Sequence, residues 1–422
     1  MMEKYFTFVK IFFKMIKRKI AVVGAGAAGC FCAVNIAEQN PDCEIFIYES
    51  GLMPLHKLSL TGGGRCNLTN TFENVESLSK VYPRGDKFLK SLFYVFDHEK
   101  TMEWFENHGV ELYSQEDARV FPRSNKAMEI VENLLEKLRK YGVWIFTGKK
   151  VSEILKDEGG KFSLLFSSGE ETSEHFDSLI VTIGGMSRSP LMESLKKIGV
   201  EIIDPVPSLF SFKVKSNVLT SLMGASVENA SVMIAGQKFR AEGGLLITHF
   251  GFSGPAVLKL SSYAARFLFE NNYKCDILIN WLNESENSVI EEINTLIKKN
   301  PQKTLQAVRP KNFTKRLWEF LLNRMEIPSE RKYSELGKKN VNKMVSVLTS
   351  DVYHVSGRGQ FKDEFVTSGG VKLSSINPKT LESKTVENLF FAGEVLDIDA
   401  VTGGFNLQAA WTTGFVVAQN FI

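Results

Sequence analysis

The sequence contains the pattern GxGxxG at Gly24-Ala25-Gly26-Ala27-Ala28-Gly29. It follows a short apolar, β-branched run at 20–23 and opens a segment of helical composition. In this setting Gly24 permits a tight turn and Gly26 lets the backbone approach a pyrophosphate, while Gly29 allows a helix to pack closely on a strand. The first turn of the helix then offers free N–H groups and a partial positive charge to the phosphates.

A carboxylate in the expected place extends this pattern. Glu49 follows Gly29 by twenty residues and ends a second expected strand, Glu44–Tyr48. An acid at that position accepts hydrogen bonds from a ribose diol. Together these features predict a dinucleotide-binding unit, with a glycine-rich turn that binds nothing as the alternative. They do not separate NAD from FAD.

The string Thr61–Asn67 (TGGGRCN) is the most unusual one in the chain. Its three glycines leave the backbone bare, so that it can lie against a flat or anionic ligand. Arg65 can pair with a phosphate or with the negative charge of a reduced flavin, and Asn67 can fix a polar ring edge. Cys66 invites a redox interpretation, because Arg65 beside it can lower its pKa. No second cysteine lies nearby in sequence, so we favour packing of Cys66 against the ligand.

Two more glycine-rich segments follow expected strands. Val181–Gly185 ends one strand, where the chain can pass close to the dinucleotide. Near the C-terminus, LFFAGE at 389–394 ends another, and TGGFNLQAA at 402–410 opens a helix from about Asn406. The N-terminus of that helix can stabilise negative charge at one edge of a flavin, and Glu394 can contact a ribityl chain.

Candidates for proton transfer are fewer. His249 lies in the segment THFGFSGPA at 248–256 and can exchange a proton near neutral pH, although a structural role is the more frequent one for such a histidine. Tyr353, His354 and Arg358 precede the segment VTSGGV at 366–371 and are weaker candidates.

The elements that must position these residues begin with a βαβ unit, in which a helix over Ala27–Gln39 joins the first two strands. Amphipathic patterns predict helices over Lys87–His108 and Lys126–Tyr141. Further strands are expected at 143–147, 150–156, 161–167 and 178–183, with the hairpin loop DEGG at 157–160.

From about Pro205 the chain changes character. Short alternating segments up to about Leu282 indicate a small β domain, either a sheet or a barrel. Residues 284–349 are helical and charge-rich in pattern, and strands return at 352–355 and 389–392.

Composition limits the possible classes. The 422 residues suit two or three domains, and 44% apolar residues suffice for sizeable cores. Lys and Arg number 51 against 48 Asp and Glu, which gives no support for nucleic-acid binding. Five cysteines without a CxxC favour the reducing cytoplasm over a disulfide framework, and no metal site is expected.

The first nineteen residues form a separate tail. They mix apolar, aromatic and basic residues, and lysines interrupt the apolar run too often for a signal peptide. No window of the chain offers the roughly 20 apolar residues of a membrane span. Either translation starts at Met15, which we favour, or the tail is a short amphipathic helix.

Six strings occur in an order that resembles the bacterial BaiN-like flavoproteins, also known as the aminoacetone oxidase family: GAGAAG, TGGGRCNLTN, RVFPRSNKA, LLITHFGFSGPA, FVTSGGV and FAGEVLDIDAVTGGFNLQAAW. The resemblance extends from about Lys19 to the C-terminus. It implies an α/β fold in which a Rossmann-type FAD domain carries an inserted β-barrel domain and a small helical domain. The FAD domain would comprise 20–205 and 360–422. The barrel domain would comprise 206–283 and 350–359, and the helical domain 284–349.

Motifs and resemblance together predict non-covalent FAD and the residues around it. Val151 would hold the adenine through its backbone. The predicted cofactor-binding residues are Gly24, Gly26, Ala28, Gly29, Glu49, Gly64, Arg65, Cys66, Asn67, Val151, Thr182, Gly184, Gly185, Gly370, Val371, Gly393, Glu394, Gly404, Phe405, Asn406 and Leu407.

The predicted function is that of an FAD-dependent oxidoreductase, which exchanges a hydride between flavin N5 and a small organic substrate held between the FAD and barrel domains. One form is an NAD(P)H-dependent reductase of activated double bonds. The alternatives are an amine oxidase that releases hydrogen peroxide and a flavin-binding protein without turnover. His249 is the candidate catalytic residue.

Overall fold

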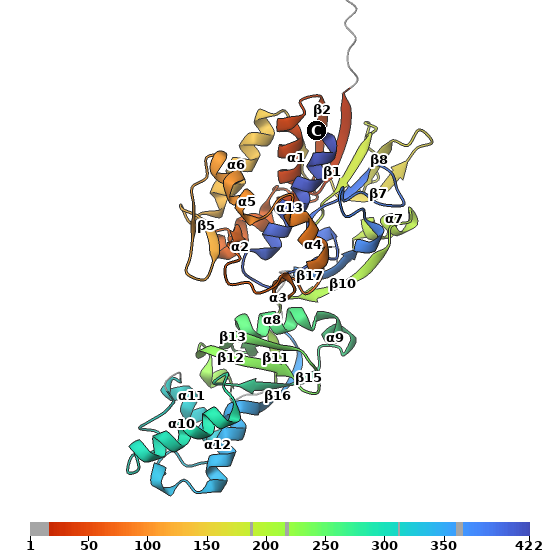
Figure 1. Cartoon of the computed structure of the whole chain (residues 1–422). Helices are drawn as coiled ribbons and strands as arrows, with labels where there is room; N and C mark the ends of the chain where they lie inside the picture. Colours follow the sequence, from red (N-terminus) through yellow and green to blue (C-terminus); the bar gives the residue numbers. More distant parts are fainter. Residues whose placement is uncertain (1–16, 186–188, 216–218, 311–312, 360–365) are drawn as a thin grey trace, which may run out of the picture.

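The computed structural model describes residues 17–185, 189–215, 219–310, 313–359 and 366–422. Expectations for residues 1–16 of the tail therefore lie outside the described residues. Figure 1 shows a Rossmann domain at the top, a β-barrel beneath it and a group of helices at the far end.

A five-stranded parallel sheet forms the centre of the Rossmann domain. Its order is β18 (Leu389–Phe391), β9 (Ser178–Val181), β1 (Arg18–Val23), β2 (Cys43–Tyr48) and β6 (Trp144–Phe146). The central strands are nearly continuous apolar runs, as expected for strands that are covered on both faces. In register, Val23 lies beside both Tyr48 and Val181, so the strands end at one level.

Helices α1 (Ala27–Gln39), α6 (Ala127–Lys140) and α13 (Phe405–Ala418) pack on this sheet or on one another. The expected single helix over 87–108 is wrong, because the structure has α4 (Asp86–Phe93) and α5 (His98–Asn107) instead. The Asp97 side chain accepts a hydrogen bond from Lys100 N at 3.0 Å and starts a new helix there.

Smaller elements complete the domain. The predicted hairpin is confirmed, since β7 (Val151–Lys156) and β8 (Phe162–Phe166) pair antiparallel. The other α-helices and strands described within residues 49–197 are α2 (His56–Gly64), β3 (Thr69–Asn70), α3 (Leu78–Val81), β4 (Leu112–Ser114), β5 (Arg119–Pro122) and α7 (Pro190–Lys197).

Two strands lead out of this domain and back. β10 (Ile202–Ser208) and β17 (Val366–Val371) pair antiparallel beside the Rossmann domain. Between them the chain forms a closed six-stranded barrel, whose strands in chain order are β11 (Phe212–Val214), β12 (Ser226–Ile234), β13 (Arg240–Ile247), β14 (Gly251–Ser253), β15 (Cys275–Asn280) and β16 (Asp351–Arg358). Helices α8 (Pro255–Tyr263) and α9 (Ala265–Glu270) follow β14 and lie on the side toward the Rossmann domain.

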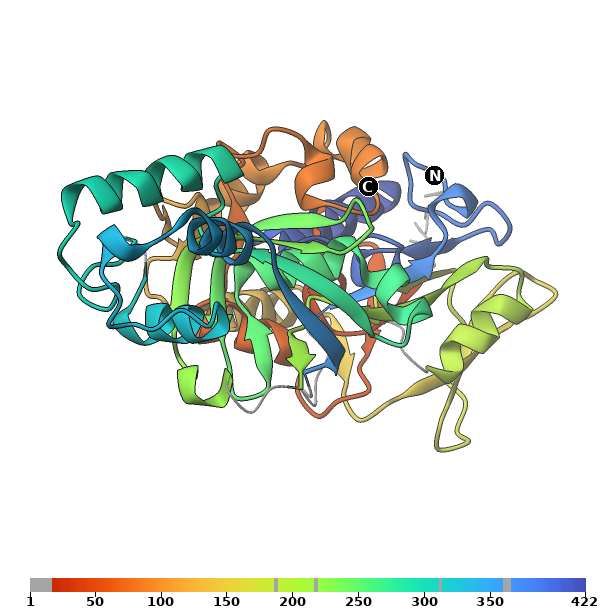
Figure 2. The ribbon, with the colours of Figure 1, turned by 90° about the horizontal axis from the view of Figure 1, so that it is seen from below.

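The helical segment consists of α10 (Glu286–Lys299), α11 (Lys315–Arg324) and α12 (Lys338–Ser350). Its apolar side chains join those of the barrel in one continuous core, separate from the core of the Rossmann domain. Viewed from below, α10 (teal) and α7 (yellow-green) lie at opposite ends of the molecule (Figure 2). The expected fold class, a Rossmann domain with an inserted barrel and helices, is confirmed.

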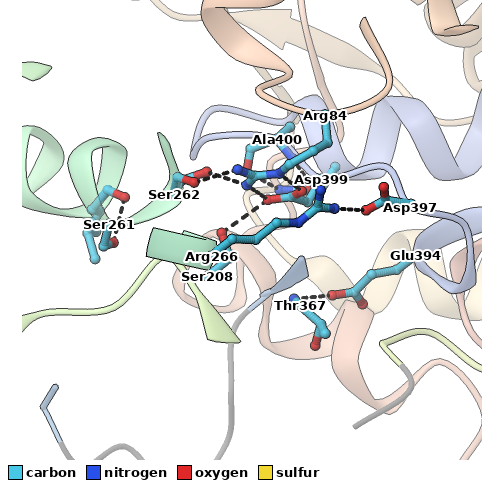
Figure 3. A network of polar contacts seen from close by, with 12 residues as sticks. Arg84, Ser208, Ser261, Ser262, Arg266, Thr367, Glu394, Asp397, Asp399 and Ala400 are labelled. Carbon is cyan, nitrogen blue, oxygen red and sulfur yellow. Dashed lines mark hydrogen bonds and ion pairs between the residues drawn. The ribbon is translucent and has the colours of Figure 1, made fainter. Parts of the chain in front are cut away.

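A polar network joins the two parts (Figure 3). Arg84 of the Rossmann domain pairs with the fully buried Asp399 and donates to Ser262 O of α8 at 2.8 Å. Ser208 donates to Asp399 at 3.1 Å, and Arg266 of α9 pairs with Asp397 at 2.6 Å. Burial raises the pKa of Asp399, while Arg84 and Ser208 favour its ionised form.

Candidate functional site

A cavity of about 1170 Å³ opens at the carboxyl ends of the parallel strands. Ligands of open α/β sheets bind at this edge, and ordinary ligand pockets measure roughly 300–1,000 Å³. The cavity is therefore large enough for a ligand at the upper end of that range. Fourteen predicted residues line it: Gly24, Gly26, Ala28, Glu49, Asn67, Val151, Thr182, Gly184, Gly185, Gly393, Glu394, Gly404, Asn406 and Leu407.

The turn between β1 and α1 shows what each glycine does. A Cβ at Gly24, which has φ +109°, would meet Thr182 O at 2.5 Å. A Cβ at Gly29 would collide with Gly24 O and with the Thr182 hydroxyl, which itself donates to Gly24 O at 2.8 Å. Gly26, in contrast, borders the cavity with nothing within 4 Å of a Cβ, which leaves room for a phosphate at the start of α1.

Glu49 is held at the end of β2 by two backbone donors. Ala25 N donates to Oε2 at 2.8 Å and Gly51 N donates to Oε1 at 2.7 Å. These contacts fix the carboxylate beside the glycine turn, where a ribose attached to the pyrophosphate would lie.

The start of α13 forms the opposite part of the cavity. A Cβ at Gly404, which has φ +92°, would collide with Thr69 O. The Asn67 amide donates to Thr69 O at 3.1 Å and accepts from Gly404 N at 2.9 Å. The Asn406 amide pairs with both backbone groups of Ala400 at 2.9 and 3.0 Å. Both asparagines therefore brace the loops around the helix, and the ring contact expected of Asn67 stays a prediction.

In the TGGGR segment, Arg65 Nε donates to Gly62 O at 3.2 Å, but only part of the segment borders the cavity. Gly62 and Gly63 line the cavity, whereas Gly64, Arg65 and Cys66 do not. The Arg65 guanidinium lies over the Phe121 ring, 4.5 Å from its centroid. Cys66 is fully buried, and burial raises the pKa of its thiol to about 12. A neutral, enclosed thiol suits packing and contradicts an activated one.

Glu394 faces the cavity between two backbone donors. Thr367 N donates to Oε1 at 2.9 Å and Gly185 N donates to Oε2 at 3.2 Å. Burial raises the pKa of this carboxyl, and the charge of Lys57 works against that rise. Contact with a ribityl chain stays a prediction.

Sequence reasoning missed the basic side chains of the cavity. Four of them, Lys57, Arg119, Lys149 and Lys150, line it together with two acids, Glu49 and Glu394. Arg119 and Lys149 pair with Asp117 and Glu170, and the ammonium groups of Lys57 and Lys150 complement a pyrophosphate dianion. These residues come from three distant segments without a shared motif, so no local signal singled them out.

The barrel side of the cavity was missed as well. Leu209, Ser211, Ser253 and Leu258 line it there, beside Val366 at the start of β17. Ser211 Oγ donates to Ser253 Oγ at 2.7 Å.

Several predicted residues lie behind the cavity wall. Phe405 packs against Phe72 and Tyr82, and a Cβ at Gly370 would collide with Val395 O. Gly29 and Val371 likewise do not line the cavity, nor do the three residues at 64–66 discussed above. They shape the backbone around the site, and their direct contact with a cofactor stays a prediction.

The candidates for proton transfer lie elsewhere. His249 is exposed, stacks edge-on against Phe250 and does not line the cavity. Tyr353 is enclosed in the barrel, where burial raises its pKa, and exposed His354 pairs with Asp276 at 2.7 Å. Arg358 lies over the Tyr273 ring. The structure gives none of them a place at the cavity, and the catalytic role of His249 stays a prediction.

The donor set fits FAD. The cavity has the volume, the bare backbone at Gly26 meets open space, and two helices, α1 and α13, begin at the cavity without a side-chain cap. Within the described ranges, no three His, Cys, Asp or Glu side chains are grouped to hold a metal ion. No helix of the part that the structure describes has the length and apolarity needed to cross a bilayer.

Comparisons with known proteins extend over nearly the whole chain. A family model described as the HI0933-like protein Rossmann domain matches residues 18–420. A 3-dehydro-bile acid delta(4,6)-reductase of Clostridium scindens is 28% identical over 410 residues, covering 95% of this chain and 98% of that protein. A ribosomal RNA dihydrouridine synthase of Haemophilus influenzae is 30% identical over 409 residues, covering 94% and 96%. Among solved structures, a 3-ketosteroid-delta4-(5alpha)-dehydrogenase of Rhodococcus jostii gives a TM-score of 0.48 at 13% identity, covering 97% of this chain and 99% of that one.

Proposed function

Because the chain belongs to the HI0933-like family of FAD-binding Rossmann proteins and is an FAD-dependent oxidoreductase, we propose that it reduces a carbon–carbon double bond conjugated to a carbonyl group. One observation carries this proposal: a single cavity joins the glycine-lined carboxyl edge of the sheet to a wall of the barrel that is apolar apart from two serines.

The names of two relatives support this reaction class. A bile acid delta(4,6)-reductase and a ribosomal RNA dihydrouridine synthase act on chemically different molecules. Both names describe saturation of a double bond conjugated to a carbonyl, at ring carbons of a steroid in one case and at C5=C6 of uracil in the other. We infer that the shared reaction, and not either substrate, is what the common fold retains.

Residues at the two ends of the cavity would hold FAD. Glu49 and the backbone of Val151 would bind the adenosine end, and the turn at Gly26 would bind the pyrophosphate. Gly404 and Leu407, at the start of α13, would adjoin the flavin. When bound, FAD supplies a hydride-exchanging N5. The N-terminus of α13 favours negative charge nearby, and Leu209 and Leu258 keep water away from the reacting carbons.

We propose NAD(P)H as the electron donor. The sequence contains no second GxGxxG, so a nicotinamide would dock directly into the cavity beside the flavin. All five cysteines are free thiols, which suits a reducing cytoplasm in which NAD(P)H is available.

A second candidate substrate is uridine within RNA. Residues 284–349 carry 13 basic and 8 acidic side chains, a net charge of +5, while the rest of the chain has a net charge of −2. This separation is hidden in the overall balance of +3, on which the expectation of no nucleic-acid partner rested. A basic helical segment attached to the barrel would attract a phosphate backbone.

The test is anaerobic stopped-flow mixing of the FAD-loaded protein with NADH or NADPH. We expect the visible absorbance of the flavin to be lost on mixing. The flavin absorbance should return faster when a 3-oxo-Δ4 steroid is added than with buffer alone. A uridine-containing ribosomal RNA fragment, added in the same way, tests the second candidate substrate.

The opposite behaviour would contradict the proposal. Bleaching by amines but not by either nicotinamide, followed by release of hydrogen peroxide in air, would establish the amine oxidase alternative. A flavin that no donor reduces would favour a protein without turnover.

A further inference from the structure

The barrel offers the cavity a wall of uneven polarity. Its described lining residues are Leu209, Ser211, Ser253 and Leu258. Two apolar side chains thus flank two hydroxyls that touch each other at 2.7 Å. A molecule held against this wall meets side-chain hydrogen-bonding groups at one point and apolar surface around it.

The strand register explains why both serines face the cavity. β11 and β14 pair antiparallel with Phe212 opposite Phe252, so Ser211 and Ser253 are the next pair along. Both phenylalanines are fully buried in the barrel core. Successive side chains of a strand point to opposite faces, and the serines therefore point outward, toward the Rossmann domain.

The direction of the contact leaves one proton available. Ser211 Oγ donates to Ser253 Oγ, and Ser211 is only 1% exposed. No contact within the described part of the chain gives the Ser253 proton an acceptor. A hydroxyl is one donor and accepts as well, so Ser253 can donate to a third group inside the cavity while Ser211 fixes its orientation.

We propose that Ser253 donates a hydrogen bond to the carbonyl oxygen of the substrate, and that Ser211 is its positioning residue. This inference rests on the proposed function and specifies its substrate as a ring ketone with an apolar frame. Leu209, Leu258 and Val366 provide the apolar surface beside the oxygen site.

The reaction gives this hydrogen bond its effect. A hydride adds to the β-carbon, the electron pair of the double bond moves toward the carbonyl oxygen, and a proton from water ends on the α-carbon. NAD(P)H is oxidised to NAD(P)⁺ and the double bond is reduced. Negative charge grows on the oxygen during hydride addition, so a donor placed there stabilises the transition state more than the ground state.

The binding test uses para-chlorophenol on the FAD-loaded protein, because its phenolate oxygen resembles the charged oxygen and its binding is read from the visible spectrum of the flavin. Ser253→Ala should weaken phenol binding about tenfold or more, as expected for a lost hydrogen bond to a charged group. Ser211→Ala should weaken it less, and Ser253→Thr, which keeps the hydroxyl, should restore most of the affinity. Ser91→Ala, at an exposed serine of α4, is the matched control.

Two results would overturn the inference: equal phenol affinity of Ser253→Ala and the unaltered protein, or no spectral response to phenols in the unaltered protein. Full FAD content and an unchanged Tm of each variant show that it is folded, and Ser253→Cys provides a second replacement of similar size.

Steady-state rates separate this inference from the proposed function. With a 3-oxo-Δ4 steroid, Ser253→Ala should lower kcat about 10–100-fold, a smaller effect than the loss of an oxyanion donor in a protease. Unchanged kcat/KM in this variant would contradict the role of Ser253, while the proposed reductase activity would still stand. If phenol binding depends on Ser253 but no enone is reduced, the reductase proposal is contradicted, while Ser253 keeps its role as a donor to a bound oxygen.

Discussion

At the scale of single residues, the glycines of the first turn differ in what surrounds them. Gly24 and Gly29 are closed in by Thr182 and by the turn itself, whereas Gly26 borders open cavity. The same pattern of three glycines therefore contains two that shape the backbone and one that leaves room for a ligand.

We predict that Gly26→Ala keeps its stability and loses cofactor affinity. The new methyl group would enter the space that a pyrophosphate needs, so FAD affinity should fall at least about tenfold, or 1.4 kcal/mol, while Tm without cofactor stays within about 2 °C. Gly24→Ala is the comparison, since its φ of +109° and the contact with Thr182 O should lower Tm itself. Equal loss of Tm in both variants would contradict this division.

The glycine positions could be predicted from sequence because local backbone geometry demands that residue type. The serines of the barrel could not. Ser211 and Ser253 are 42 residues apart, and only the register of β11 with β14 brings them together. Asn67 shows a third case: its place at the cavity follows the motif, whereas its hydrogen bonds to Thr69 and Gly404 depend on how distant segments fold together.

At the scale of elements, the contact between α1 and α13 sets the shape of the cavity. Gly414 lies against α1, where a Cβ would meet Ala28 O at 2.8 Å. Ala28 itself lines the cavity. A larger side chain at position 414 should therefore displace Ala28 and change the shape of the cavity wall.

We predict that Gly414→Ala lowers the free energy of unfolding by about 1–2 kcal/mol. The added methyl group forces the helices apart, which outweighs the roughly 1 kcal/mol that alanine gains over glycine within a helix. Urea denaturation measures the change. The control is Gly357→Ala in β16, where nothing lies within 4 Å of a Cβ, and it should change stability by less than about 0.5 kcal/mol.

Helices and strands could be predicted from the sequence where the pattern of apolar residues and the glycine or turn residues at its ends indicated the same boundaries. The first βαβ unit and the β7–β8 hairpin follow from apolar runs bounded by glycine or by a turn. The prediction of a single helix over 87–108 was wrong because the apolar pattern continues across the break between α4 and α5. The signal for that break was Asp97 ahead of Lys100, a cap that outweighs the pattern around it.

At the scale of the whole molecule, the Arg84–Asp399 pair of the Rossmann domain orients the Arg84 guanidinium, which donates to Ser262 O on the barrel side at 2.8 Å. Asp399 is fully buried and also accepts from Ser208, so its charge depends on Arg84. Loss of one partner from such a pair is far more costly than loss of both.

We predict that Arg84→Met destabilises the protein by about 3–5 kcal/mol at pH 8. Without the arginine, the already raised pKa of Asp399 rises further. The unfolded carboxyl ionises at its ordinary pKa, so the folded state loses stability as pH increases above that value. The loss should therefore be smaller at pH 5, as measured by urea midpoints. A double variant with Asp399→Leu should recover most of it, and a deficit independent of pH would contradict this account.

The central sheet has a further consequence for how the protein is made. β9 and its neighbour β18 are adjacent in the sheet but separated by the barrel and the helical segment in the chain. A ribosome synthesises all of that inserted chain before Leu389 emerges. Until then, β9 has no neighbouring strand on that side of the nascent sheet. Gly404, which borders the cavity at the start of α13, is translated later still, so the cavity is completed among the last events of biogenesis.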